Sequence, residues 1–466
     1  MEQVRVVSLK LMVSKEKNKV LFAEAGKDFV DVLISFLTLP LGTIARLVAM
    51  QDFVGVLVNF LTSPLGTISR LVAKESDMQP VKVGSLTTLY GSVANLDKEC
   101  LSTDTCKAML LQPRNSLEDY CRSLKVNIDD TERTQYYVCD NLKECRRGSS
   151  VMCSTFKNKK CKCGALLANP ISLRKPNVFD GFVKNNSSFI ITDDLNIVPN
   201  SLGTLFSILK KLEIKDMASV KEMVVHVTKN QVMDLLKCSL LSKTVFTDVF
   251  LGKKKLPLEK YLLASHSLSV FAAEESSKIN VKVMFKKSDG KIVCAQGKED
   301  FANFLLSFLT FPLGGVARLL EGCSSMGSVD RLYKSIIDLN EDYFKTKEVM
   351  DKVVDLGLAP QFKLSDQILP ISESKAPSYF CYTNSHEDYS GMLETCNALD
   401  MVDPISENGC AKGFVKGPTM FMATDDLVVT QMSSKSIMAL ISRIKISLND
   451  MEEKEVSIGI KEVTTV

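Results

Sequence analysis

Apolar and polar positions alternate at the start of the chain, which is typical of a β-strand buried on one face. The alternation begins at Val4 and resumes after a polar turn at residues 15–18, so a β-hairpin is predicted. From Gly26 the pattern changes, and residues 26–29 open an apolar helical stretch that extends to Leu47. The first part of the chain therefore predicts a hairpin followed by helix.

The same order of elements returns near the middle of the chain. Between Val281 and Leu320 the pattern again predicts strand, turn at 288–290, strand and apolar helix. Residues 28–48 and 300–320 share 13 identities in 21 positions. A duplication of this length indicates a repeated structural unit.

The two copies also correspond further along the chain. A Gly-Phe-Val-Lys segment occurs at 181–184 and again at 413–416. Each is followed by Thr-Asp-Asp-Leu, at 192–195 and at 424–427. The duplication therefore extends well beyond the first helix.

Each Asp pair leads into a periodic stretch that predicts a helix, near 201–212 and near 434–446. The first copy continues with a strand over Glu222–Val227 and an amphipathic helix over Gln231–Phe250. The second copy reaches a strand at 456–460 and the sequence then stops. We therefore expect the second copy to lack the closing helix and to leave an apolar face uncovered.

These patterns predict an α+β fold of two tandem repeats. Each repeat is a β-hairpin followed by paired short apolar helices and then by further short strands and helices, and the second copy is truncated. The expected boundaries are 1–258 for the first repeat, 259–278 for a linker and 279–466 for the second repeat.

A second, local duplication lies inside the first copy. Residues 28–49 and 52–73 share 17 of 22 positions, whereas the second copy has this block once. One domain has room for only one such block, so the other must pack elsewhere; an exon duplication and a faulty gene model are both possible origins. An exposed apolar block would mark a partner site, a membrane contact or an aggregation-prone surface.

The apolar blocks are too short and too interrupted to favour a membrane-spanning helix. Each contains a 17-residue run without charge, Phe53–Ser69 in the surplus block and Phe301–Ala317 in the second copy. A spanning helix needs about 20 predominantly apolar residues. Proline breaks each run, at Pro64 and Pro312, so we predict two short helices packed in the core.

Composition narrows the class of protein. The 466 residues carry a net charge of +3, which argues against a nucleic-acid-binding protein. The start of the chain has no secretory signal pattern, so we expect an intracellular, cytoplasmic protein that is not secreted. The 14 cysteines are then expected to be thiols or metal ligands rather than disulfides.

Residues 15–33 and the Pro-Leu-Gly block resemble the plant family that carries "domain of unknown function 674". The resemblance covers nearly the whole chain in two copies, and the long block recurs with its Asp-Asp-Leu element. It implies a land-plant protein of an expanded family without an established activity, and it supplies no catalytic residues.

A cysteine cluster at 139–163 is the strongest candidate site. Five of the 14 cysteines fall within 25 residues there, and the best quartet for a structural zinc is Cys139, Cys145, Cys161 and Cys163, with Cys153 the spare. Zinc takes about four thiolate or imidazole ligands in a tetrahedron. The C-x5-C and C-x-C spacings differ from the commoner C-x2-C, which favours separate reduced thiols over zinc. The second copy keeps four dispersed candidates, Cys381, His386, Cys396 and Cys410.

Two further motifs have simpler structural explanations. Residues 26–28 and 297–299 lie at predicted helix starts, but they lack the glycine and the hydroxyl residue that a phosphate loop requires. The Asp pairs at 193–194 and 425–426 could hold a hard cation, but aspartate also favours turns and helix starts. We interpret both as structural.

Signatures of nucleophilic catalysis are weak. No Gly-x-Ser-x-Gly motif occurs, and His226, His266 and His386 do not recur between the copies. The sequence therefore favours a non-enzymatic interaction or scaffold protein with a protein partner and a possible structural zinc. The alternatives are a peripheral membrane protein that uses residues 52–73, and an enzyme of unrecognised type with its site in a cleft between the repeats.

Overall fold

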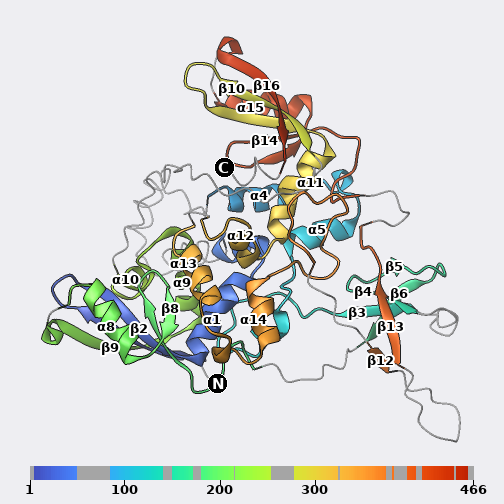
Figure 1. The fold of residues 1–466 in the computed structure, drawn as a ribbon. Coiled ribbons are helices and arrows are strands. Elements are labelled where there is room, and N and C mark those ends of the chain that lie inside the picture. Colours follow the sequence, from blue (N-terminus) through green and yellow to red (C-terminus); the bar gives the residue numbers. More distant parts are fainter. Residues whose placement is uncertain are drawn as a thin grey trace, which may run out of the picture.

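The structure is a computed structural model with an α+β fold in which helices and three sheets are mixed (Figure 1). The residues that it describes are 5–49, 84–139, 150–171, 180–214, 216–252, 278–323, 326–373, 380–382, 396–405, 412–444 and 448–459.

The first sheet is built around the predicted hairpin. Strands β1 (Val7–Ser14) and β2 (Lys19–Gly26) pair antiparallel across the turn. Three later strands extend the sheet in the order β8-β7-β2-β1-β9. These are β7 (Ser188–Thr192), β8 (Ile197–Pro199) and β9 (Val220–Val227).

The second sheet repeats this topology with the order β15-β14-β11-β10-β16. Its strands are β10 (Ile279–Lys286), β11 (Ile292–Gly297), β14 (Phe421–Thr424), β15 (Val429–Gln431) and β16 (Met451–Ile458). Each strand occupies the position of its counterpart in the first sheet. The tandem repeat seen in the sequence is therefore also a repeat of structure, and the two sheets lie at opposite ends of the molecule in Figure 1.

Two short helices follow each hairpin, as predicted. In the first copy α1 (Lys27–Thr38) is separated by Pro40 from a second helix at 41–49. In the second copy α11 (Glu299–Ser307) passes through η4 (Phe308–Thr310) and is separated by Pro312 from α12 (Leu313–Leu319). Proline ends the first helix of each pair because it has no N–H for the helical hydrogen bond.

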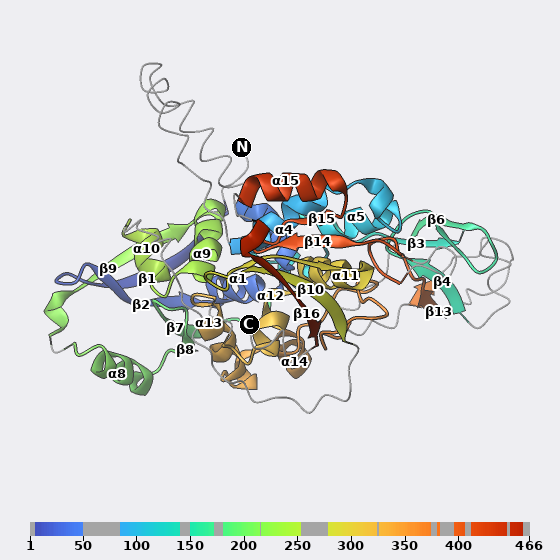
Figure 2. The same cartoon turned by 90° about the horizontal axis from the view of Figure 1, so that it is seen from above.

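The outer face of each sheet carries one helix, α8 (Leu202–Lys211) or α15 (Ser434–Ile444). Figure 2 shows α15 along β14 and β15, and Leu440 packs against Val293 and Met422 there. The closing helix predicted over Gln231–Phe250 was wrong in one respect, because it is two helices, α9 (Lys229–Leu241) and α10 (Val245–Phe250). The Ser242 hydroxyl accepts a hydrogen bond from the Thr244 N–H at 3.0 Å, and such local bonding competes with helix continuation.

The helices that follow in each copy pack on the sheet of the other copy. Segments α4 (Gly84–Asn95), η2 (Lys98–Cys100) and α5 (Asp104–Leu111) belong to the core of the second sheet. Segments α13 (Val329–Ile337), η5 (Glu341–Tyr343) and α14 (Lys347–Val354) belong to the core of the first. In Figure 1 the light-blue α4 and α5 accordingly lie beside yellow and red elements, and the orange α13 and α14 beside blue and green ones.

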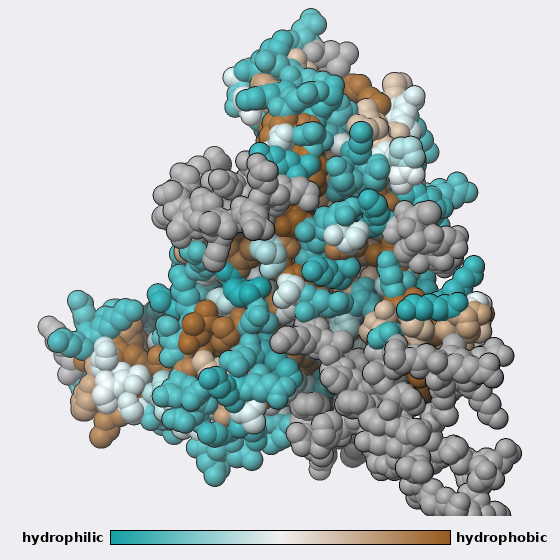
Figure 3. Space-filling model, turned by 45° about the vertical axis from the view of Figure 1, so that its right-hand side comes forward, coloured by the Kyte–Doolittle hydropathy of each residue, from teal (hydrophilic) through white to brown (hydrophobic). Residues whose placement is uncertain are grey.

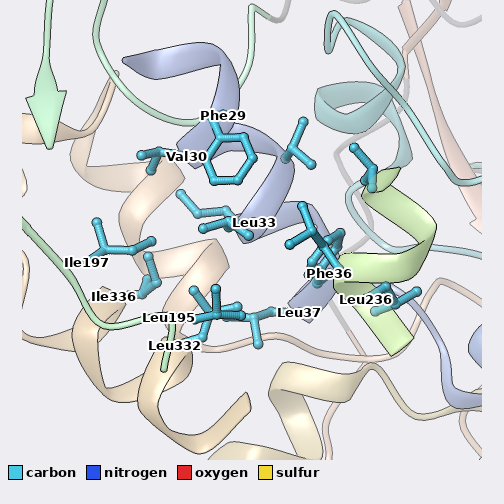
Figure 4. Packing of buried hydrophobic residues seen from close by; sticks show 14 of the residues in the cluster. Phe29, Val30, Leu33, Phe36, Leu37, Leu195, Ile197, Leu236, Leu332 and Ile336 are labelled. Carbon is cyan, nitrogen blue, oxygen red and sulfur yellow. The ribbon is translucent and has the colours of Figure 1, made fainter. Parts of the chain in front are cut away.

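Figure 4 shows this exchange inside the first core, where Leu332 of α13 lies beside Leu37 of α1 and Ile336 lies beside Ile197. Both α13 residues have no exposed surface. We call each sheet with its exchanged helices a unit, so that each unit contains residues of both copies. After the exchange the chain returns to its own unit, and α6 (Glu118–Arg122) packs in the first core through Tyr120 and Cys121.

The two copies cross at a short antiparallel backbone contact between Pro40 and Pro312. The Leu41 N–H donates to the Phe311 carbonyl at 2.9 Å, and the Leu313 N–H donates to the Leu39 carbonyl at 2.9 Å. Glycine follows on each side. A Cβ at Gly42 would lie 2.9 Å from the Leu309 carbonyl oxygen, and one at Gly314 would lie 2.5 Å from the Leu356 side chain.

A second pair of backbone contacts fixes each exchanged segment between its two helices. The Lys345 N–H donates to the Phe182 carbonyl at 3.0 Å, and the Lys184 N–H donates to the Tyr343 carbonyl at 2.8 Å. The corresponding contacts in the second unit are equally direct, since the Lys416 N–H donates to Cys100 and the Ser102 N–H to Phe414. The repeated Gly-Phe-Val-Lys segment is therefore the site where each sheet unit receives the other copy's segment.

A third, six-stranded sheet contains strands of both copies in the order β12-β13-β4-β3-β6-β5, and we call it the shared sheet. The second copy's β13 pairs in parallel with the first copy's β4. In Figure 1 this sheet projects to one side of the two units. Its strands are β3 (Tyr136–Cys139), β4 (Ser150–Ser154), β5 (Lys159–Lys160), β6 (Leu166–Ile171), β12 (Phe380–Tyr382) and β13 (Cys396–Met401).

The two hairpins differ in how far an apolar residue at the same position is exposed. In the first unit α10 covers the hairpin, so Val20 is 1% exposed, with its N–H bonded to Thr247. Its counterpart Ile292 is 49% exposed. On the face drawn in Figure 3, apolar atoms reach the surface in separate patches between hydrophilic residues.

The close packing at the crossing predicts that adding a single methyl group there destabilises the fold. Gly42→Ala should lower the free energy of unfolding by about 1–3 kcal/mol, because the new Cβ would press on a backbone carbonyl that cannot move aside. Urea unfolding of the full chain measures this change.

Gly91→Ala in α4 is the matched control, since a Cβ there meets nothing within 4 Å. Replacing glycine inside a helix should raise stability by about 0.5–1 kcal/mol. Equal stabilisation by the two substitutions would show that the crossing is not tightly packed.

Candidate functional site

Three of the four predicted metal ligands meet at one end of the shared sheet. The Sγ atoms of Cys139, Cys161 and Cys163 lie within 4.8 Å of one another, and those of Cys139 and Cys163 are 3.5 Å apart. Cys139 and Cys161 are buried and Cys163 is exposed. The cluster is therefore buried at Cys139 and Cys161 and exposed to solvent at Cys163.

Local backbone geometry places these thiols. Cys139 is the last residue of β3, and a register shift after Val138 accompanies its pairing with β6. Residues 161–164 form a turn in which the Gly164 N–H donates to the Cys161 carbonyl at 2.9 Å. Gly164 has φ +88°, a conformation that glycine adopts without strain, so the turn holds Cys161 and Cys163 on one side.

The separation of the thiols suits a tetrahedral zinc ion. With zinc–sulfur bonds of about 2.3 Å, sulfur atoms on a tetrahedron lie about 3.8 Å apart. A disulfide needs about 2.05 Å, which the Cys139–Cys163 pair does not approach. The three residues therefore fit as three ligands of one metal ion, and the predicted fourth, Cys145, lies outside the described residues.

Cys153 does not join this cluster, which agrees with its role as the spare. It packs with Val138 and Val151, whereas Cys139 and Cys161 pack with Leu167. Neighbouring strand residues point to opposite faces of a sheet, so Val138 and Cys139 separate the two clusters. In the second copy Cys381 and Cys396 belong to the paired strands β12 and β13, while His386 and Cys410 lie outside the described residues.

A residue that sequence reasoning missed, Gln361, anchors the shared sheet to the second unit. Its Oε1 accepts hydrogen bonds from the Thr155 N–H at 2.7 Å and from the Thr155 hydroxyl at 2.6 Å. Its Nε2 donates to the Ser154 hydroxyl and to the Val402 carbonyl. Gln361 has a positive φ of +73°, and no sequence pattern signals its role because Ser154 and Thr155 lie more than 200 residues away and Val402 lies 41 residues away.

The glycine–lysine motifs lie at helix starts, as interpreted from the sequence. Gly26 precedes α1 and Lys298 precedes α11. In α1 the Lys27 ammonium bonds Asp31 at 2.6 Å, and Asp31 in turn accepts hydrogen bonds from the Phe182 and Val183 N–H groups. This network attaches the helix to the Gly-Phe-Val-Lys segment, which is a structural role.

Each Asp pair lies in a turn, and the carboxylates of Asp193 and Asp426 have hydrogen-bond partners in the chain. Asp193 is buried and accepts hydrogen bonds from the Thr247 N–H at 2.9 Å and from the Thr247 hydroxyl at 2.7 Å. Asp426 accepts from Thr424 and pairs with Arg443. Their hydrogen bonds to nearby N–H and hydroxyl groups account for these carboxylates, as the turn interpretation requires.

Asp193 has the most strongly shifted carboxyl pKa that the structure assigns. Burial raises its pKa to about 6, against the hydrogen bonds from Thr247 and the charge of Lys19, which lower it. The counterpart Asp425 has a side chain that is 59% exposed. The difference arises because α10 covers the first unit at this position.

The only histidine that the structure describes, His226, shows no catalytic arrangement. Its Nδ1 lies 3.2 Å from the Ser8 hydroxyl across the β1–β9 pair, on the exposed side of an edge strand. The corresponding pair in the second unit is Asn280 and Ser457, which bond at 2.6 Å. The recurrence of a polar cross-strand pair without histidine indicates sheet stabilisation.

The membrane alternative rests on residues 52–73, which lie outside the described residues. In the part of the chain that the structure describes, none of the helices has the length and apolar character needed to cross a membrane.

Comparison with known proteins gives one match. A family model described as "Protein of unknown function (DUF674)" matches residues 3–51 and 48–461. No curated protein and no solved structure matches the chain.

The raised pKa of Asp193 predicts a pH dependence of stability. The folded protein holds one more proton than the unfolded chain between about pH 4 and pH 6, so stability is lost as the pH rises through this window. Asp193→Asn removes the titration and keeps the acceptor. We therefore expect the difference in free energy of unfolding, variant minus parent, to be about 2–3 kcal/mol larger at pH 7 than at pH 4. Urea unfolding at the two pH values measures it.

Asp425→Asn is the control at the equivalent exposed position, and it should change stability by less than about 0.5 kcal/mol at either pH. A pH-independent difference between Asp193→Asn and the parent would contradict the assignment.

Proposed function

Because the chain belongs to the family described as "Protein of unknown function (DUF674)", whose description assigns no activity, we propose a function from its own geometry. The protein is a non-enzymatic interaction protein, and its binding element is the shared sheet, stabilised by a structural zinc ion. The observation that carries this proposal is the convergence of Cys139, Cys161 and Cys163 in a sheet that projects from both units.

A bound zinc ion would supply stability that the small apolar core of the shared sheet does not. Among the residues whose burial the structure describes, the two apolar clusters of this sheet contain three buried residues each, Val138, Val151 and Cys153 on one side and Cys139, Cys161 and Leu167 on the other. So small a core stabilises a sheet weakly, and small modules of this kind commonly depend on a metal or disulfide. Cys139, Cys161 and Cys163 would hold the metal, with Cys145 as the fourth ligand, in a closed site that is structural rather than catalytic.

The form of the shared sheet suits a protein partner. Among the described strands it is open, with β12 at one edge and β5 at the other. An open edge presents backbone N–H and C=O groups to which an extended peptide can add as a further strand. The second copy's β13 is already added to the first copy's β4 in this way.

The metal part of the proposal is tested on the full chain purified without chelators. We expect about one zinc per chain by elemental analysis, because one tetrahedral site takes one ion. The double variant Cys161→Ser/Cys163→Ser should lose it, since it removes two of the three converging ligands. Cys145→Ser should also lower zinc content if Cys145 is the fourth ligand.

Two variants control for general effects of removing cysteine. Cys153 lies in the other cluster, and Cys323 is exposed beside Lys334 of α13, so Cys153→Ala and Cys323→Ser should both retain about one zinc. Metal-free parent protein with an ordinary folded circular dichroism spectrum would overturn the zinc site.

The interaction part needs its own readout. Crosslinking and mass spectrometry should recover partners of the full chain that the zinc-free double variant loses while its two units stay folded. The same set of partners with both proteins would exclude the shared sheet as the binding element.

A further inference from the structure

Strand β9 forms one edge of the first sheet, at the lower left margin of the molecule in Figure 1. All eight of its residues pair with β1 on one side, and none of the described strands pairs with it on the other. An edge of this length presents a row of backbone N–H and C=O groups to which a further strand can add. The outer edge of β9 is therefore a candidate interaction surface, far from the shared sheet.

The centre of β9 is apolar, which is unusual for an exposed edge. Met223, Val224 and Val225 follow one another there, and Val224 is 56% exposed. Met223 and Val225 lie on the opposite face, partly buried against the first core. Charged residues commonly occupy the centre of an edge strand and discourage association. In β9 they are absent from the three central positions.

The equivalent edge strand of the second sheet, β16, does carry these charges. Both strands pair with the first strand of their hairpin in the same register, so Lys454 corresponds to Met223 and Glu455 to Val224. The Glu455 side chain is 79% exposed. The repeated fold thus accommodates a charged residue at this position, and an exposed valine in β9 is not needed for folding.

We propose that β9 is a homodimer interface, at which a second copy of the chain adds its own β9 antiparallel to the first. A two-fold axis perpendicular to the sheet joins the two first sheets into one and keeps equivalent faces on the same side. With the axis at Val224, this residue lies opposite itself and Met223 lies opposite Val225 of the other copy. Glu222 then lies opposite His226, and the symmetry forms each unlike pair twice.

The outer pair in this arrangement is complementary in charge and hydrogen bonding. Glu222 and His226 are exposed on the same face as Val224. The Ser8 hydroxyl lies 3.2 Å from His226 Nδ1, and when it donates there the proton of the ring is on Nε2. That N–H faces the carboxylate of the other copy. Glu222 uses Oε1 toward Lys10 at 3.5 Å, which leaves Oε2 for the imidazole.

Other registers of the same symmetry lose this complementarity. With the axis at Met223 or Val225, Val224 lies opposite Glu222 or His226. With the axis at Glu222, two carboxylates lie opposite one another, and like charges in a cross-strand pair are destabilising. Self-pairing of β16 about Glu455 has the same defect. A strand of another protein is the rival occupant of β9, but the match between Glu222 and His226 is supplied by the chain itself.

Sedimentation velocity of the full chain over a concentration series tests the dimer. A reversible monomer–dimer equilibrium is expected, with a dissociation constant on the order of 10 μM because a single strand pair is a small interface. Val224→Glu gives β9 the residue that β16 has and should weaken the dimer at least about tenfold, since two carboxylates then face each other.

Glu455→Gln at the equivalent position of β16 is the matched control and should leave the dissociation constant unchanged. Val224 and Glu455 are both exposed, so both variants should fold, and thermal unfolding checks this.

A charge exchange separates pairing between copies from an effect inside one copy. His226→Glu places a second carboxylate opposite Glu222 and should weaken the dimer about tenfold. The double variant Glu222→His/His226→Glu restores an unlike pair across the interface, so its dissociation constant should return to within about threefold of the parent value. Inside one copy the exchange disrupts the contacts with both Ser8 and Lys10, so a purely internal effect would grow instead.

The register is tested with Val224→Cys and oxidised glutathione. Opposite residues of an antiparallel pair have Cβ atoms about 4.5–5.5 Å apart, close enough for a disulfide after a small shift. The two thiols give up two protons and two electrons, which reduce oxidised glutathione to two thiols. Mass spectrometry should find a peptide joined to its own copy at position 224. Glu222→Cys should give no such product, because its two copies lie about 13 Å apart along the strands.

A parent chain that stays monomeric at about 100 μM would overturn the proposal and leave β9 to a strand of another protein. A dimer that Val224→Glu does not weaken would also overturn it, because its interface would lie elsewhere. These outcomes do not depend on zinc, since β9 and the cysteine cluster share no residue. The variant Cys161→Ser/Cys163→Ser should therefore dimerise as the parent does.

Discussion

The architecture depends on one close backbone contact, the antiparallel crossing of the two copies at Pro40 and Pro312. Proline ends the first helix of each pair at this point, and glycine two residues later lets the second helix approach the other copy. The two hydrogen bonds of 2.9 Å on either side fix the relative position of the copies. The helices that follow next in each copy, α4 and α5 or α13 and α14, then pack on the opposite sheet.

The exchange explains why the copies form one structure rather than two adjacent domains. Each apolar core is completed by helices of the other copy, so neither sheet is covered by its own sequence neighbours alone. The shared sheet adds a further connection, since β13 of the second copy pairs with β4 of the first. Gln361 then ties that sheet to the second unit through hydrogen bonds at its base.

The two units share a backbone scaffold but differ in the side chains at equivalent positions. In the first unit Lys27, Asp31 and Asp180 form a closed ionic network next to the stacked Tyr120 and Phe182. In the second unit Asn303 still accepts a hydrogen bond from the Val415 N–H, but the charges are replaced and a cavity of about 850 Å³ opens beside Glu299. The same comparison distinguishes Asp193 from Asp425, because α10 buries the first and the second is exposed.

The sequence alone determined the elements and their repetition, because hairpins, proline breaks and helix starts depend on neighbouring residues. It identified the β1–β2 hairpin, the paired helices around Pro40 and the turns at the Asp pairs, and it selected the cysteines that converge. It misjudged the closing helix, where Ser242 and Thr244 bond locally. The helix exchange, the shared sheet and the cavity beside Glu299 were decided only by the tertiary structure, since their contacts join residues far apart in the chain.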